Sequence, residues 1–190
     1  MSITRPAGPS GGAAIIGRVV PHLLSRGPGA LPPTGGAAAP QTSQPIQLFM
    51  LKSSDITDES FVKKAVPVGW RYLIFGQGPI AVADVKEASG SGPLTFGSLI
   101  RGPIAERLTQ AADLAARDYD AGPGKFEARI LEIPSLYISA LWLYGPRDIF
   151  IPFLEGGARD TMPVRVDTSF ASHVVELAAA KRQVPKAENR

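Results

Sequence analysis

The amino-acid composition changes abruptly at Pro45, and this change limits how much of the chain can fold. Glycine, proline and alanine account for 23 of residues 1–45, and this segment has no Phe, Trp or Tyr. Such a segment buries too little apolar surface to offset the entropy lost when it is ordered. We therefore expect a disordered arm over residues 1–45, a globular domain over residues 46–181 and a basic tail over residues 182–190.

Residues 13–26 are an exception within this arm, because their apolar side chains recur four residues apart, as on one stripe of a helix. Basic side chains repeat at the same interval on another face. Gly17 and Pro21 weaken a free helix, since proline removes a backbone donor. The pattern predicts an amphipathic segment that docks to a partner or lies on a membrane surface. The residues expected to dock are Ile15, Ile16, Arg18, Val19, Val20, Leu23, Leu24 and Arg26.

Charge is distributed unevenly along the 190 residues. The net charge of +3 comes from the two ends, because residues 55–180 carry 12 basic and 16 acidic side chains. A basic folded surface that would grip a phosphate backbone is not implied, so we do not expect nucleic-acid binding. The chain also has no cysteine, which excludes disulfides, thiolate metal sites and a cysteine nucleophile.

Apolar periodicity and turn residues after Pro45 predict a single domain, α/β in the α+β sense, with helices packed on one antiparallel-rich sheet. The expected order is α-β-β-α-β-β-β-α. The segments are a helix over 59–66, a hairpin of strands 70–75 and 80–85, a helix over 103–119, a meander of strands 126–133, 136–144 and 148–153, and a last helix that starts near Ser169 and ends before Pro185. The middle strand of the meander is apolar on both faces, so it should be covered on both.

This element order resembles that of profilin-like and roadblock-type domains over residues 57–182. The resemblance lies in the inferred topology, and no sequence motif carries it. It implies a binding or dimerisation module.

Glycine-rich spans do not indicate a nucleotide site. Gly76 and Gly78 fit a hairpin turn, and the glycines at 97 and 102 are followed by Pro103 instead of the lysine of a phosphate-binding loop. The candidates for catalysis are His173, Glu155 and Asp160. The plain alternatives are a residue on the first turns of the last helix for His173 and a solvated loop for the two acids. The ligand spacing for a metal site is missing, and no cofactor is expected.

Large apolar side chains gather at the end of the meander. Two interpretations stay open: the helices cover these side chains, or they form a dimer or partner interface. The candidate interface residues are Trp142, Tyr144, Ile149, Ile151 and Phe153.

The sequence favours a non-catalytic interaction or structural module that docks to a larger assembly through its N-terminal arm. The alternatives are an enzyme or toxin effector with a delivery segment, and a peripheral membrane-surface protein. A protein partner is expected and a homodimer is a further option. We expect a cytoplasmic location, with organelle targeting or delivery by a secretion-type assembly as alternatives, because no signal peptide or membrane span is visible.

Overall fold

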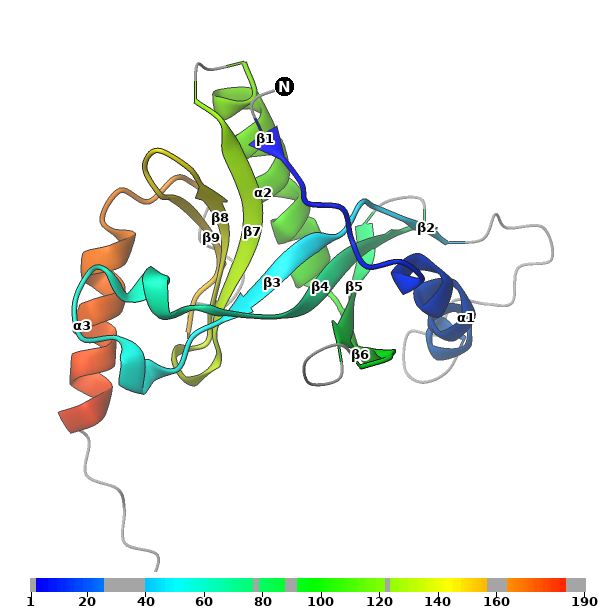
Figure 1. The fold of residues 1–190 in the computed structure, drawn as a ribbon, viewed down its shortest axis with the longest axis horizontal. Helices are drawn as coiled ribbons and strands as arrows, with labels where there is room; N and C mark the ends of the chain where they lie inside the picture. The colour runs from blue at the N-terminus through cyan, green and yellow to red at the C-terminus, as the bar shows by residue number, and fades with distance from the viewer. Residues whose placement is uncertain are drawn as a thin grey trace, which may run out of the picture.

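A computed structural model describes residues 3–25, 40–76, 79–87, 92–121, 124–156 and 164–183. One nine-stranded mixed sheet organises the fold, with the path β6-β5-β4-β3-β7-β8-β9 (Figure 1). The strands are β1 (Ile3–Thr4), β2 (Gln41–Thr42), β3 (Ile46–Met50), β4 (Val66–Phe75), β5 (Pro79–Glu87), β6 (Leu94–Arg101), β7 (Phe126–Ile133), β8 (Ile138–Tyr144) and β9 (Ile149–Leu154). The helices are α1 (Gly12–Leu24), α2 (Pro103–Tyr119) and α3 (Phe170–Gln183), with short 3-10 turns η1 (Ser53–Asp55), η2 (Phe61–Lys64) and η3 (Pro134–Leu136).

Two short strands lie between β4 and β7, at the same position in the strand order as β3. β1 runs parallel to the start of β7, and β2 runs antiparallel to the end of β4. β3 itself is antiparallel to β4 and parallel to β7. The two halves of the sheet are therefore joined through β3.

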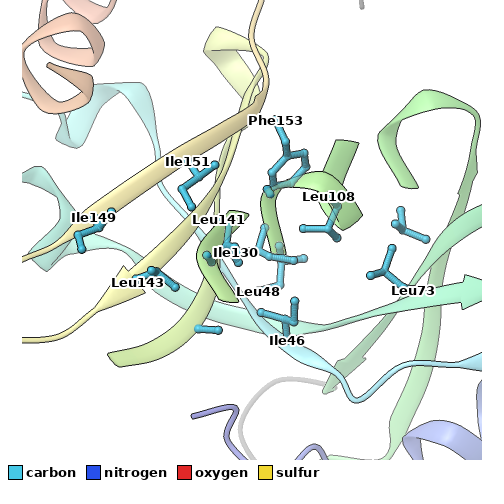
Figure 2. Packing of buried hydrophobic residues seen from close by; sticks show 14 of the residues in the cluster. Ile46, Leu48, Leu73, Leu108, Ile130, Leu141, Leu143, Ile149, Ile151 and Phe153 are labelled. Atoms are coloured by element: carbon cyan, nitrogen blue, oxygen red, sulfur yellow. The ribbon is translucent and has the colours of Figure 1, made fainter. Parts of the chain in front are cut away.

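Helix α2 covers one face of the sheet, which we call the α2 face. Leu108 belongs to the largest buried cluster, together with Leu73, Ile130 and Phe153 (Figure 2). Along α2 the residues Ala105, Leu108, Ala111 and Ala115 are buried, which is the spacing of one helical stripe. The burial of this stripe fixes α2 against the sheet.

The opposite face carries two separate clusters. α1 covers the β4–β6 part through Ile16, Val20 and Leu24. α3 and η2 cover the β7–β9 part, where Phe170 and Val174 are buried. In Figure 1 these two helices lie at opposite ends of the molecule.

The mixed α/β class, the single large sheet and three helices confirm the coarse expectation. The predicted hairpin is β4–β5, the predicted meander is β7–β8–β9, and the helix expected over 103–119 is α2. β8 is buried on both faces between Ile138 and Leu143, as its composition predicts.

The expected element order is wrong in three places. Residues 46–50 and 94–101 form strands β3 and β6, which the order α-β-β-α-β-β-β-α omits. The helix expected over 59–66 is a single 3-10 turn, because the chain enters β4 at Val66. The likeness to the order of profilin-like and roadblock-type domains is weakened accordingly.

The described part of the predicted arm is folded. β1 adds to the sheet, and α1 packs on it, because burial of three apolar side chains outweighs the disfavoured Pro21 within the helix. The prediction of a disordered arm over residues 1–45 is therefore wrong for residues 3–25, and also for Gln41–Thr42, which form β2. Residues 26–39 and 184–190 lie outside the described residues.

Candidate functional site

β6 forms one end of the sheet. Its only strand neighbour among the described residues is β5, so its outer edge has no strand partner there. The half-buried side chains of Leu94, Phe96 and Leu99 pack with the cluster under α1, whereas Ile100 on the α2 face is 38% exposed. β6 is thus an eight-residue edge strand with apolar side chains on both faces.

α1 lies next to this edge strand. The guanidinium of Arg101 on β6 donates a hydrogen bond to the carbonyl oxygen of Leu23, at the end of α1. Leu23 is 37% exposed, and Ile15 and Val19 are half-buried. Arg18 is exposed on the same helix. A basic and partly apolar helix therefore lies beside this edge strand.

The structure places the predicted docking residues on several faces of α1. Ile16, Val20 and Leu24 are buried in the protein's own core, so they are not free to bind a partner or a membrane. Arg26 lies outside the described residues. The other predicted docking residues remain half-buried or exposed.

A buried charged cluster holds β6 in place from the α2 face. The hydroxyl of Ser98 on β6 donates to Oδ2 of Asp84 at 2.9 Å. Asp84 in turn accepts two hydrogen bonds from Arg71, and Nη1 of Arg71 lies 2.6 Å from Oε1 of Glu132. Polar contacts thus run from β6 through β5 and β4 to β7.

The electrostatics of this cluster keep Arg71 charged. Burial alone would lower the pKa of Arg71, because it disfavours the charged form. The hydrogen bonds that Arg71 donates to Asp84 and the negative charges of Asp84 and Glu132 outweigh burial and raise the pKa above its usual range. The guanidinium is therefore a permanent buried cation.

The structure brings together two of the three predicted catalytic candidates. Nε2 of His173 on α3 lies 2.5 Å from Oε1 of Glu155, which follows β9. Both side chains are about one-third exposed, at 39% and 33%. Asp160 lies outside the described residues.

Nearby hydroxyl groups are engaged elsewhere. The hydroxyl of Ser169 donates to Asp167 at 2.7 Å, and that of Ser172 donates to Glu59 at 2.5 Å. The contact between His173 and Glu155 is therefore a carboxylate–imidazole pair. In these hydrogen bonds neither serine hydroxyl donates to that pair. Within the described ranges, no group of three His, Asp or Glu side chains is placed to hold a metal ion.

The candidate interface at the end of the meander divides into two parts. Trp142, Ile149, Ile151 and Phe153 are buried within the chain, and Tyr144 is 46% exposed. The first interpretation therefore holds for four of the side chains, which the chain itself covers. The fifth, that of Tyr144, remains at the surface.

Tyr144 belongs to a stack that the sequence did not reveal. The guanidinium carbon of Arg129 lies 3.8 Å from the ring centre of Tyr144, 4.7 Å from that of Phe49 and 5.0 Å from that of Trp142. Nε of Arg129 donates to Glu127 at 2.6 Å. Only strand pairing could have shown this, because β3 is remote from β7 and β8 in sequence.

The edge strand was also missed, although part of its signal is present. Leu94, Thr95 and Phe96 alternate as in a strand, but the alternation breaks at Gly97. The register of β6 on β5 shifts there, between Asp84 and Val85. A β-bulge therefore hides the period of two.

No family model, curated protein or solved structure matches this chain. No described helix is both long and apolar enough to cross a membrane.

Proposed function

We propose that this protein is a non-catalytic interaction module that binds an extended segment of a partner protein along the outer edge of β6. The observation that supports it is the edge strand itself, which has no strand partner on its outer side among the described residues. Free N–H and C=O groups on an edge take up a further strand. Residues 94–100 also contain no charge and no proline, two usual protections against such pairing.

The partner segment should be extended, with apolar residues at alternate positions. One face of an added strand would lie on the side of α1, and the other on the side of Ile100, because side chains alternate across a strand. Arg18 and His22 on α1 are exposed, and α1 has no acidic residue. Charge complementarity therefore favours a segment that also carries acidic residues.

The N-terminal arm keeps a role in this proposal. α1 docks on its own sheet and forms the wall beside the binding edge, instead of reaching out to the partner. The arm then acts by positioning the edge.

The proposal is tested by blocking the edge with charge. Thr95→Lys and Ile100→Lys place lysines on β6, and lysine on an edge strand opposes pairing with another chain. Quantitative mass spectrometry of proteins captured by the full chain should show partners that the wild type retains and the double variant loses. Light scattering of the purified chain shows whether a second copy is such a partner.

Val66→Lys is the matched control, because Val66 is 55% exposed and lies on β4, away from the β6 edge. It should capture the same partners as the wild type. An unchanged set of partners in the β6 variant, with the fold intact by circular dichroism, would rule out the edge as the binding element.

The contact between His173 and Glu155 supports a second candidate function, an enzyme or effector that uses acid–base chemistry. A carboxylate can orient an imidazole as a general base. If so, His173→Ala and Glu155→Gln should abolish activity or toxicity and leave thermal stability nearly unchanged. Equal activity of both variants and the wild type would exclude this role.

A further inference from the structure

A groove of about 400 Å³ lies on the α2 face, at the end of the sheet where β1 and β2 join it. Its floor includes Ile46, Leu141 and Leu143, and Ala112 and Ala116 of α2 form one wall. The N-terminal segment closes the other side. Most of the lining is therefore apolar.

The groove is open because the sheet splits there and α2 offers only small side chains. β1 pairs with β7 and β2 pairs with β4. The position between β4 and β7, which β3 occupies further along the sheet, is therefore divided here between two separate strands. In Figure 1 the two strands lie apart, β1 beside β7 and β2 at the far end of β4. Towards its other end α2 fills the space under it with Leu108, whereas here it presents alanines.

Two charged side chains line the groove, and only one of them is free. Asp120 accepts a hydrogen bond from the backbone N–H of Ile3 at 3.2 Å and makes a further contact. Arg5 is exposed, and its side chain has no hydrogen bond or ion pair with any described residue. The charged group that is available to a ligand is therefore a cation.

We infer that this groove binds a medium-chain carboxylate, a ligand with an unbranched apolar tail and one anionic end. The tail lies between the alanines of α2 and the sheet, and the carboxylate pairs with Arg5. Pockets for small molecules are typically apolar with a few placed polar groups. The volume holds roughly a dozen heavy atoms at about 30 Å³ each, the share of one water molecule, which is about the size of decanoate. The site is independent of the β6 edge, so either proposal stands without the other.

The test is a titration of the full chain with sodium hexanoate, octanoate and decanoate, followed by calorimetry and by amide NMR shifts. Affinity should rise by up to about fourfold for each added methylene, as expected for a chain removed from water. The largest shifts should fall on Ala112, Ala116 and Leu141. Decyltrimethylammonium, which has the same tail and the opposite charge, should bind more weakly than decanoate.

Two variants test separately how the apolar tail and the carboxylate of the ligand contribute to binding. Ala112→Leu fills the groove and should abolish decanoate binding, whereas Ala180→Leu, at an exposed position on α3, should not change it. Arg5→Gln should weaken decanoate up to about fivefold, the usual limit for an exposed ion pair, and leave decanol unaffected. Ala116→Leu gives a second filling variant should Ala112→Leu unfold the chain.

Absence of binding at every chain length would overturn the inference. Binding that neither filling variant weakens would overturn it as well, because the ligand would then lie elsewhere.

Discussion

Arg71 and Asp84 face each other on neighbouring strands β4 and β5 and are joined by two parallel hydrogen bonds. Nε donates to Oδ1 at 2.7 Å and Nη2 donates to Oδ2 at 2.9 Å. The whole Arg71 residue is 1% exposed. Since Glu132 adds a second carboxylate beside the same guanidinium, one buried cation holds three strands together.

Removal of this cation should strongly lower the free energy of unfolding. Arg71→Met leaves Asp84 and Glu132 facing each other without a positive charge, and breaking a buried pair typically costs about 3–5 kcal/mol. Urea unfolding followed by circular dichroism should show this loss in the free energy of unfolding. Arg117→Met, which removes an exposed arginine from its pair with Asp118, should leave it nearly unchanged. A loss below about 1 kcal/mol for Arg71→Met would contradict the expectation.

Gly12 at the start of α1 should not tolerate a side chain. A Cβ there would lie 2.2 Å from Oη of Tyr72, so Gly12→Ala requires α1 or the buried ring of Tyr72 to shift. Overpacking of this kind costs about 1–3 kcal/mol. Tyr72→Phe removes the hydroxyl and leaves Cζ at 3.2 Å, so the double variant should recover part of the loss. A double-mutant cycle by thermal unfolding measures the recovery.

Gly17 provides the matched control on the same helix. Nothing lies within 4 Å of a Cβ at this position, which is exposed in the interior of α1. Gly17→Ala should therefore stabilise the protein by about 0.5–1 kcal/mol, because glycine is a poor helix former. Destabilisation by both substitutions to a similar extent would show that the contact with Tyr72 is not the cause.

Tyr72 should also make the protein sensitive to high pH. Burial raises the pKa of Tyr72 above its ordinary value of 10.0. The phenol then ionises first in the unfolded chain, so its contribution is complete below about pH 10 and is lost as pH rises through the folded pKa. The free energy of unfolding, measured in urea from neutral to strongly alkaline pH, should fall less steeply for Tyr72→Phe than for the wild type. Parallel slopes would exclude this linkage.

Local sequence signals predicted some elements correctly. They failed for strands that form through pairing with residues distant in the sequence. Gly102 followed by Pro103 marks the start of α2, and the apolar stripe of that helix is complete in the sequence. β6 was missed because the bulge at Gly97 interrupts its alternation. β3 was missed because a short apolar run buried on both faces has no period to read.

The candidate sites show the same division. Composition alone indicated that residues 1–45 could not fold. The side chains of Ile16 and Val20 nevertheless pack against β4 and β5, and no local sequence pattern predicts these contacts. The pairing of His173 with Glu155 joins α3 to the end of β9, two elements that the sequence did predict. The position of β6 at the end of the sheet and the groove beside Arg5 depend on strand order, which the sequence does not encode locally.

Arg129 gives a last prediction, because its planar guanidinium is stacked among three aromatic rings. The side chain is 17% exposed and its guanidinium carbon lies 3.8 Å from the ring centre of Tyr144. Arg129→Lys keeps the charge and loses the planar stack, so we expect a loss of about 1–2 kcal/mol in the free energy of unfolding. Arg117→Lys, at a side chain that is 72% exposed, should leave stability nearly unchanged.

Urea unfolding followed by tryptophan fluorescence suits this test, since Trp142 is one of the rings beside Arg129. If Arg129→Lys is as stable as the wild type, the positive charge and the aliphatic part of the side chain are sufficient. If it is destabilised while Arg117→Lys is not, the stack itself holds β3, β7 and β8 together on the face between α1 and α3.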